Sequence, residues 1–320
     1  METTQTLTEI AEDIYTGLTA RPKYILSKYF YDDRGSKIFR EIMNMPEYYL
    51  TNAEAEIFSI HTTDISTQFC DTCASIDLVE LGAGDGAKTR ILLEHMYNNN
   101  VSFRYIPIDI SEEANRILTA SLYERYKGIR IEEKTGDYFD MMGELSQLYT
   151  NRKVVMFLGS NLGNLSIPES LDFLKKLSSM MTSKDKLFLG LDLKKDPDII
   201  RKAYDDAAGH TREFNLNLLT RFNRELDTDF DTSCFRHAPV YDPFTGTAKS
   251  YLVSTKDQVV RFPAIGKEIE FQKWEAIYTE MSQKYDLDLI RELAESSGFE
   301  VIKNYYDRQG YFINTLWAKI

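Results

Sequence analysis

The sequence predicts an α/β fold in which a mostly parallel sheet is covered by helices on both faces. Two observations lead to this prediction. Between residues 76 and 191, short and nearly continuous apolar segments alternate with segments of helical spacing, as is typical of parallel strands buried on both sides. Residues 196–285 then break this rhythm and show the two-residue alternation of half-buried strands, which predicts an inserted α+β subdomain.

The elements of the first half follow from local patterns. Apolar residues at helical spacing predict helices over 6–20 and 35–45, and Pro46 ends the second of them. Thr51 or Asn52 would cap a third helix over 53–61. Apolar, β-prone segments predict the strands of the sheet at 76–81, 103–109, 129–134, 154–158 and 187–191.

The second half is predicted in the same way. Residues 198–226 have the pattern of one or two helices. Alternating segments predict further strands at 235–240, 248–254, 259–262 and 268–271. A last helix over 287–297 is closed by Gly298, and a terminal strand pair over 299–305 and 311–318 completes the sheet.

Composition and charge exclude several classes of function. Apolar residues make up 43% of the 320 residues, which is enough for a globular core. The chain has 38 Lys and Arg against 50 Asp and Glu, so its net charge of −12 lacks the basic excess that a nucleic-acid partner requires. No apolar run is long enough to span a bilayer, and the first four residues do not resemble a signal peptide. We expect a cytoplasmic monomer without a membrane partner.

The cysteines and histidines do not form a recognisable metal site. Cys70 and Cys73 form one C-x-x-C, Cys234 stands apart, and the four histidines are scattered. A zinc site would need a second pair of ligands nearby. We therefore expect no metal, with a redox or metal pair at Cys70 and Cys73 as the alternative to simple loop thiols.

A glycine cluster lies where a predicted strand meets a predicted helix. Gly82, Gly84 and Gly86 would let the backbone turn tightly and approach a ligand closely. Asp109 ends the next strand, where a carboxylate can accept hydrogen bonds from both ribose hydroxyls. The combination predicts a nucleoside site, with a purely structural turn as the alternative.

The glycines alone do not identify the nucleoside, because the cluster also satisfies the looser dinucleotide fingerprint. Three features favour S-adenosylmethionine. Glu80 places an acid two residues before the first glycine, which suits a cationic ligand better than a pyrophosphate. Asp137 and Tyr138 could hold an adenine by a hydrogen bond and a ring face. The closing strand pair suits a methyltransferase sheet better than a dehydrogenase sheet. Lys88 could pair with the methionine carboxylate, or be a solvated helix lysine.

Several longer motifs carry a resemblance that covers nearly the whole chain. They are Tyr31-Asp32-Asp33-Arg34-Gly35-Ser36, Pro46-Glu47-Tyr48-Tyr49, Leu158-Gly159-Ser160-Asn161-Leu162-Gly163-Asn164, Ala203-Tyr204-Asp205-Asp206-Ala207-Ala208-Gly209, Asn223-Arg224-Glu225-Leu226 and Glu280-Met281-Ser282. Together they resemble the histidine-specific Nα-methyltransferases of ergothioneine biosynthesis. The resemblance implies a Rossmann-like methyltransferase sheet and three methyl transfers from S-adenosylmethionine to free L-histidine. The products would be hercynine and S-adenosylhomocysteine.

With this resemblance the predicted elements divide into four segments. Residues 1–60 form a helical segment that contributes to the substrate pocket. Residues 61–195 form the Rossmann-like domain that binds S-adenosylmethionine, and residues 286–320 complete it. Residues 196–285 form the inserted substrate-binding subdomain.

The resemblance also implies roles for residues that bind the amino acid. Asn164 and Tyr204 are similar to the residues that hold its carboxylate and amine. Tyr48 resembles the tyrosine that approaches the amino group, and Tyr31 a further tyrosine of the pocket. These two tyrosines are the candidate catalytic residues, and Tyr31, Tyr48 or a water could accept the amine proton. Gly159 would line the pocket through its backbone.

The remaining implied residues surround the imidazole. Phe214 resembles an aromatic pocket wall, and Glu280 and Ser282 resemble the pair that binds the ring nitrogens. Without the resemblance, Glu280 and Ser282 would be taken as solvated positions on a helix or loop. Ser250 stands where the family can carry a methionine, and a smaller, polar residue there could widen the substrate range.

Two other functions remain open at this point. The acceptor could be another aromatic amino acid, such as tryptophan or its prenylated form, or histidine could be methylated fewer than three times. An indole offers one N–H donor and no acceptor, so Glu280 and Ser282 together favour histidine. The chain could also be a non-catalytic module that binds a nucleoside.

Overall fold

The computed structural model describes residues 2–71 and 75–320, with side chains from residue 7 onward, and the chain divides into two compact units. The first unit consists of Met1–Tyr49 and Lys195–Ser282. The second consists of Leu50–Lys194 and Gln283–Ile320. Each unit therefore combines two stretches that are far apart in the sequence.

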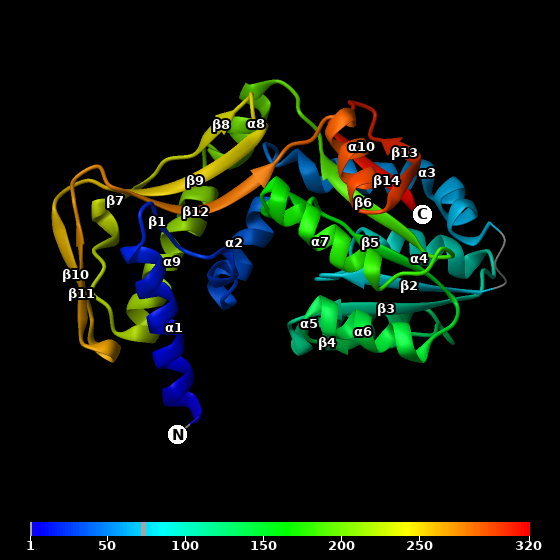
Figure 1. Cartoon of the computed structure of the whole chain (residues 1–320), viewed down its shortest axis with the longest axis horizontal. Helices are drawn as coiled ribbons and strands as arrows, with labels where there is room; N and C mark the ends of the chain where they lie inside the picture. Colours follow the sequence, from blue (N-terminus) through cyan, green and yellow to red (C-terminus); the bar gives the residue numbers. More distant parts are fainter. Residues whose placement is uncertain (1, 72–74) are drawn as a thin grey trace. The chain divides into compact units, whose positions relative to one another are not determined.

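The second unit contains a seven-stranded sheet in the order β13-β14-β6-β5-β2-β3-β4 (Figure 1). Neighbouring strands from β6 to β4 are parallel, whereas β14 is antiparallel to both β6 and β13. The strands are β2 (Ile76–Leu81), β3 (Phe103–Asp109), β4 (Lys134–Thr135), β5 (Arg152–Phe157), β6 (Lys186–Asp192), β13 (Phe299–Tyr306) and β14 (Phe312–Lys319). The predicted α/β fold with an antiparallel terminal strand pair is confirmed.

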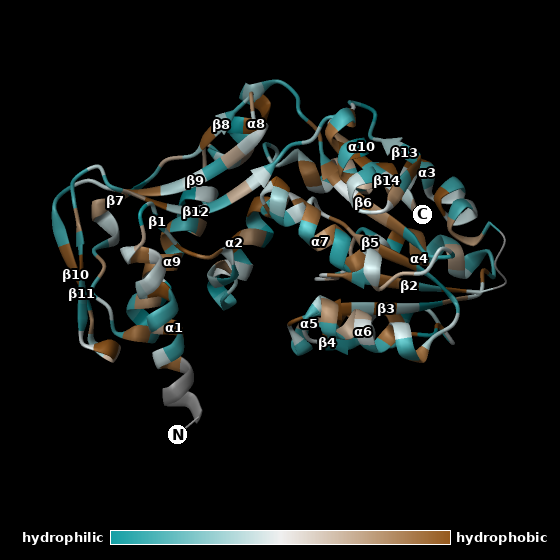
Figure 2. Cartoon of the chain, viewed as in Figure 1, coloured by the Kyte–Doolittle hydropathy of each residue, from teal (hydrophilic) through white to brown (hydrophobic). Residues whose placement is uncertain are grey.

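Helices cover both faces of this sheet. They are α3 (Tyr49–Cys70), α4 (Thr89–Asn98), α5 (Glu112–Arg125), α6 (Tyr138–Leu148), α7 (Ile167–Ser179) and α10 (Leu287–Ser296). On one face, Leu145, Leu177 and Leu293 of α6, α7 and α10 pack against the strands. On the other, Phe58 and Phe69 of α3 contact the ring of Phe188 on β6. All six residues of β2 are buried, and Figure 2 shows apolar residues along the central strands.

Two predicted elements of this unit have different bounds in the structure. The third strand, predicted over 129–134, is reduced to β4 at the sheet edge and one isolated bridge between Tyr105 and Ile131. Its alternating charged residues limit burial there. The helix predicted over 53–61 runs from Tyr49 to Cys70, so Thr51 and Asn52 lie inside it instead of capping it. Buried Ile65 and Phe69 continue its apolar face beyond the predicted end.

The first unit packs helices against a smaller sheet. Its helices are α1 (Glu2–Thr19), η1 (Ser27–Phe30), α2 (Asp33–Asn44), α8 (Pro197–Tyr204), α9 (His210–Leu226), η3 (Thr232–Cys234) and η4 (Pro263–Ile265). The sheet order is β1-β12-β9-β7, with β8 also paired to β9, and β10 and β11 form a separate hairpin. The strands are β1 (Lys23–Tyr24), β7 (Phe235–His237), β8 (Val240–Asp242), β9 (Thr247–Ser254), β10 (Gln258–Phe262), β11 (Lys267–Phe271) and β12 (Ala276–Gln283). The hydrophobic core of the first unit contains Leu218 and Phe222 of α9 together with Ile14 and Leu18 of α1.

Strand β12 was not predicted, although it carries Glu280 and Ser282. Its buried positions begin with regular alternation at Ile277 and Thr279, but Glu280 and Met281 are both half-buried. Polar residues at most of its other positions weaken the strand signal further.

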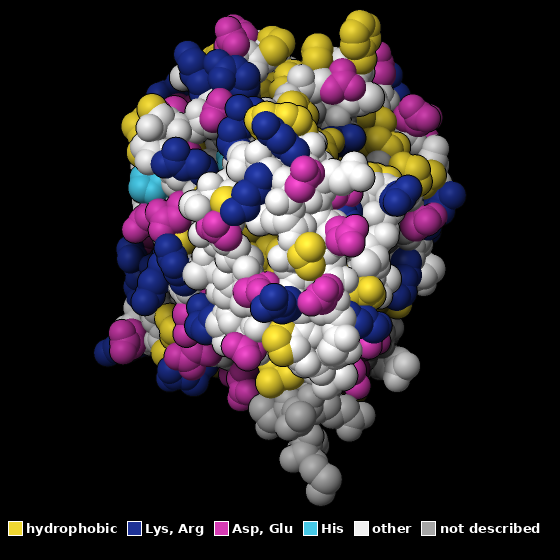
Figure 3. Space-filling view, turned by 90° about the vertical axis from the view of Figure 1, so that its left-hand side faces the viewer, with side chains coloured by type: hydrophobic (Ala, Val, Ile, Leu, Met, Phe, Trp, Pro, Cys, Tyr) yellow, Lys and Arg dark blue, Asp and Glu magenta, His cyan; other side chains and the backbone are white. Residues whose placement is uncertain are grey.

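The surface of the first unit that faces the viewer in Figure 3 carries positive and negative side chains interspersed with one another. Ion pairs of this unit include Lys267 with Glu12 at 3.1 Å and Arg261 with Glu268 at 3.6 Å. Among the described residues, no helix is both long enough and apolar enough to cross a membrane.

Candidate functional site

The predicted glycine turn links β2 to α4, at the carboxyl ends of the parallel strands. Gly82, Gly84 and Gly86 all have positive φ, at +72°, +54° and +62°. A Cβ on Gly82 would lie 2.7 Å from the hydroxyl oxygen of Tyr138, whereas a Cβ on Gly84 would face open space. The turn therefore needs glycine for its conformation and leaves room above Gly84 for a ligand.

Asp109 lies beside this turn at the end of β3. Its Oδ2 accepts a hydrogen bond from the Gly84 N–H at 3.1 Å, and its Oδ1 accepts one from the Ser111 N–H at 3.0 Å. Burial, followed by the charges of Asp109 and Asp137, raises the pKa of Tyr138 to about 12. The structure thus brings together Gly82, Gly84, Asp109 and Tyr138. Asp137 is exposed and caps α6 through its Oδ1, which accepts from the Phe139 N–H at 2.8 Å.

Glu80 is buried beneath the turn. Its Oε1 accepts from the Thr89 hydroxyl at 2.6 Å and its Oε2 from the Tyr105 hydroxyl at 2.5 Å. Burial raises the pKa of Glu80 to about 7, against the lowering effect of these two hydrogen bonds. The carboxyl group joins β2 to β3 and to the first turn of α4, so it supports the glycine turn from below.

Lys88 at the start of α4 lies beside Gly159, which follows β5. A Cβ on Gly159 would lie 3.1 Å from the Lys88 Nζ. Both residues contact Glu54 of α3: the Nζ of Lys88 at 2.5 Å and the N–H of Gly159 at 2.9 Å. Glu54 was missed by the sequence reasoning, although an acid between the apolar positions of one helix face is a detectable signal. Asn164 is exposed at the end of η2 (Asn161–Asn164), which follows β5.

In the first unit, predicted aromatic residues meet around Phe39 of α2. The Tyr31 ring centre lies 5.6 Å from that of Phe39 and 5.9 Å from that of Phe214. The Tyr48 ring centre lies 6.4 Å from that of Phe39. Tyr31 is 52% exposed, whereas Phe214 is 3% exposed and stacks on Phe30. Tyr204 is half-buried at the end of α8.

Glu280 belongs to a chain of buried polar contacts. The side-chain amide of Asn215 on α9 donates to the Glu280 Oε1 at 3.3 Å. The Thr279 hydroxyl lies 2.6 Å from the Asn215 Oδ1 and 3.0 Å from the carbonyl oxygen of Ser250. Asn215 is fully buried, and the sequence reasoning did not single it out. Ser282 is also buried, two residues beyond Glu280 on β12.

The Ser250 hydroxyl lies 3.1 Å from the Nε2 of His237 on β7. Burial lowers the pKa of His237 to about 4, while the carboxylates of Asp205 and Asp206 oppose this shift. The imidazole is therefore neutral at pH 7, and the Ser250 hydroxyl has a polar partner within the sheet.

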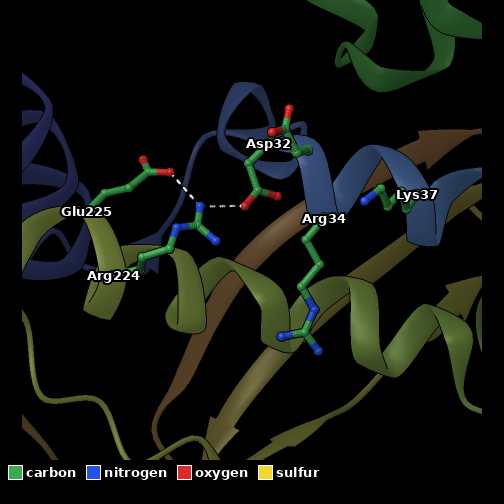
Figure 4. A pocket seen from close by; sticks show the side chains of 6 residues that line it. Asp32, Arg34, Lys37, Arg224 and Glu225 are labelled. Carbon is green, nitrogen blue, oxygen red and sulfur yellow. Dashed lines mark hydrogen bonds and ion pairs between the residues drawn. The ribbon is translucent and has the colours of Figure 1, made fainter.

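A separate pocket of about 530 Å³ lies on the first unit (Figure 4). It is lined by Asp32, Asp33, Arg34, Lys37, Arg224 and Glu225. Figure 4 shows the Arg224 guanidinium between the carboxylates of Asp32 and Glu225, and the distances are 2.7 and 2.6 Å. The ion pair between Arg224 and Asp32 fixes the Tyr31–Ser36 motif against α9, and none of the residues predicted for the donor or the substrate lines this pocket.

Comparison with known proteins decides the family. A model of the family described as "Histidine-specific methyltransferase, SAM-dependent" matches residues 10–319. The chain belongs to this family. The match confirms the resemblance that the motifs predicted, and it makes the chain an S-adenosylmethionine-dependent methyltransferase. The open space above Gly84, beside Asp109 and Tyr138, fits a nucleoside donor.

The names of curated relatives agree with this family assignment. Histidine N-alpha-methyltransferase of Mycolicibacterium smegmatis is 37% identical over 90% of this chain and 88% of its own length. The Mycobacterium tuberculosis protein of the same name is 33% identical over 97% of this chain and 95% of its own length. Ergothioneine biosynthesis protein 1 of Neurospora crassa is 30% identical over 92% of this chain, and the match covers 33% of that protein.

The structure can also be compared with the alternative of a metal or redox pair at Cys70 and Cys73. Among residues 7–71 and 75–320, whose side chains the structure describes, there is no group of three His, Cys, Asp or Glu side chains placed to hold a metal ion. Of the C-x-x-C pair, Cys73 lies outside the described residues, and Cys70 is the last residue of α3.

Proposed function

We propose that this methyltransferase transfers methyl groups from S-adenosylmethionine to the α-amino nitrogen of free L-histidine, and that three successive transfers yield hercynine for ergothioneine biosynthesis. The observation that carries the proposal is the family match over residues 10–319, together with the two curated relatives named for histidine Nα-methylation. The roles of individual residues below are part of the proposal.

The second unit supplies the donor site. Asp109 would accept hydrogen bonds from the ribose hydroxyls, and Tyr138 and Asp137 would bind the adenine. Lys88 would pair with the methionine carboxylate, and Glu80 would keep the glycine turn in shape. Exposed Ile110, which follows Asp109 and is 83% exposed, adds an apolar surface for the adenine face. When bound, S-adenosylmethionine supplies a methyl carbon on a sulfonium, which is open to in-line displacement.

Methyl transfer requires a neutral amine, so the substrate ammonium has to lose a proton, and Tyr31, Tyr48 or a water is the proposed acceptor. The α-amino group at the end of a peptide has a pKa of about 7.7–8.0, and the carboxylate of a free amino acid raises the pKa of its amine further, so only a small fraction is neutral near pH 7. The protein then has to orient the nitrogen lone pair about 3–3.5 Å from the methyl carbon, and such positioning can supply roughly 7–11 kcal/mol of the barrier. We assign this orientation to Tyr48 and Tyr31, with Asn164 and Tyr204 holding the carboxylate and amine.

The charge of the trimethylated product gives a reason for aromatic residues in the proposed substrate pocket. After three transfers the nitrogen is a quaternary cation that donates no hydrogen bond. The rings of Tyr48 and Tyr204 would contact such a cation through their faces, at about 0.5–2 kcal/mol for each contact, and Phe214, buried against Phe30, would support the aromatic wall from behind. Aromatic walls therefore suit an acceptor that begins as an amine and ends as a trimethylammonium.

The imidazole provides the selectivity. The Glu280 carboxylate, held by Asn215, would accept from one ring N–H, and Ser282 would contact the other nitrogen. Gly159 would line the pocket with its backbone. Ser250 already has His237 as a partner, which supports a place at the edge of the imidazole site rather than direct binding. A site that hydrogen-bonds its substrate rejects analogues lacking the group by roughly 10⁴-fold.

A mass spectrum of L-histidine incubated with the protein and S-adenosylmethionine tests the proposal. We expect one, two and then three added methyl groups, with the trimethylated product dominant at long times. A parallel incubation with all twenty amino acids and labelled donor measures selectivity. Labelled tryptophan without labelled histidine would overturn the proposal, and donor binding without turnover of any amine would indicate a binding module.

We also propose that the protein works in the cytoplasm as a monomer. The acidic composition supports a chain that acts on a small metabolite rather than on a nucleic acid. Sedimentation equilibrium should give a mass near 37.1 kDa, and fractionated cells should hold the activity in the cytosol. A dimer mass or a membrane fraction would contradict this assignment.

A further inference from the structure

Glu54 is a carboxylate enclosed within the second unit. It lies on α3 with its side chain 0% exposed. Its Oε2 accepts from the Lys88 ammonium at 2.5 Å and from the Gly159 N–H at 2.9 Å. Its Oε1 accepts from the side-chain amide of Asn314 on β14 at 3.0 Å. The groups that contact the two oxygens are thus all donors, as an ionised carboxylate requires.

The sheet is shaped to admit this side chain. A Cβ on Gly190 of β6 would lie 2.0 Å from the Glu54 Oε1 and 3.2 Å from the amide nitrogen of Asn314. Any other residue at position 190 would therefore displace the carboxylate. A buried charge is costly unless it is paired and hydrogen-bonded, so the space at Gly190 and the donors around it form a dedicated site for Glu54.

Lys88 is not enclosed to the same degree. Its side chain is 25% exposed, whereas that of Glu54 is 0% exposed, so Lys88 extends from the buried carboxylate toward solvent. An ammonium has three N–H donors, and those that do not contact Glu54 remain available to a second carboxylate. Lys88 begins α4 and Gly159 follows β5, so both lie at the edge of the sheet where the carboxyl ends of the parallel strands meet and where ligands of open α/β sheets bind.

We propose that Glu54 is the positioning residue of the donor site: it holds the Lys88 ammonium where the amino-acid end of S-adenosylmethionine binds. This inference rests on the donor site described above. A lysine side chain is flexible, and ordering it at the moment of binding would reduce affinity. Glu54 orders it beforehand. Glu54 thereby acts through Lys88 and does not itself touch the ligand.

A pair of ligands separates this role from a general structural one. S-adenosylhomocysteine contains the amino-acid end, whereas 5′-methylthioadenosine keeps the adenosine and lacks that end. Calorimetry on Glu54→Gln should show a loss of at least tenfold in affinity for S-adenosylhomocysteine, with affinity for 5′-methylthioadenosine within twofold of the native protein. The double variant Glu54→Gln with Lys88→Met should bind S-adenosylhomocysteine no worse than Lys88→Met alone.

Two further variants complete the test. Gly190→Ala displaces the carboxylate while keeping every charge, and it should give the same selective loss if Glu54→Gln does not fold. Glu56→Gln changes a neighbouring acid on α3 that pairs with Arg308, and it should leave both affinities unchanged. An equal loss for both ligands, or an unchanged affinity for S-adenosylhomocysteine, would overturn the proposal. Histidine is absent from these measurements, so the result does not depend on histidine being the acceptor.

Discussion

Glu280 is a half-buried carboxylate whose Oε1 is held by the amide of Asn215. If it binds the imidazole, Glu280→Ala should raise the KM for histidine about 10- to 100-fold, since a hydrogen bond to a charged group contributes about 1.5–3 kcal/mol. Affinity for S-adenosylhomocysteine should stay within about twofold. Steady-state kinetics and calorimetry measure both. Glu270→Ala, which changes an exposed acid of the same unit, is the control. An unchanged KM for histidine would refute the imidazole role.

Substitution of Asp109 should weaken binding of the donor, whereas substitution of Glu280 should weaken binding of histidine. Asp109→Ala removes the carboxylate proposed to bind the ribose, and we expect about a 10- to 100-fold loss of affinity for S-adenosylhomocysteine. The 5′-methylthioadenosine affinity should fall equally, because that ligand keeps the ribose. This common loss distinguishes Asp109 from Glu54. Exposed Asp140 on α6 provides a control, as Asp140→Ala. Normal affinity in Asp109→Ala would show that another group holds the ribose.

At the scale of elements, α2 depends on one side chain at its start. The Asp32 Oδ1 accepts from the Gly35 N–H at 2.7 Å and from the Asn217 amide at 2.8 Å, and Arg224 pairs with Oδ2. Asp32→Ala should lower the free energy of unfolding by about 1–2 kcal/mol, the usual effect of losing a helix N-cap. Exposed Asp33 only complements the helix dipole, so Asp33→Ala should cost about 0.5 kcal/mol. Urea titrations that give equal losses would contradict the capping role.

The burial of His237 on β7 gives the first unit a stability that depends on pH. The pKa of His237 is about 4 in the folded chain and about 6.5 when unfolded. Between these values only the unfolded chain takes up the proton, so stability is present above pH 6.5 and falls as pH decreases toward 4. From pH 7 to pH 5 this loss is about 2 kcal/mol. His237→Gln should remove it, as measured by urea unfolding at both pH values. The same pH dependence in the variant would refute this origin.

At the scale of the whole molecule, the predicted reaction needs no metal. The donor is a sulfonium and the acceptor an amine, so both reacting groups come from the substrates. Treatment with a chelator followed by gel filtration should leave the rate of histidine methylation within about 20% of that of the untreated protein. Mass spectrometry of the native protein supplies the metal content. If activity were lost on chelation and zinc restored it, the result would support a metal site at Cys70 and Cys73 instead.

The sequence was sufficient for much of this molecule. Alternating apolar strands and helices predicted the parallel sheet, because strand and helix periods are local properties of the chain. Its glycine turn was predicted from φ preferences, and Asp109 from its place at the end of the next strand. The long motifs predicted the family, which the match over residues 10–319 confirms.

Only the tertiary structure decided which side chains meet. Glu54 and Asn314 are 260 residues apart, and Asn215 and Glu280 are 65 apart. No local pattern encodes such pairs, since they depend on which faces of distant elements pack together. Strand β12 could not be predicted for the same reason. Its polar residues weaken the two-residue alternation, and its place beside β9 and α9 depends on tertiary packing. The sequence determined the fold and the chemistry available to it, and packing selected the buried partners that hold those groups in place.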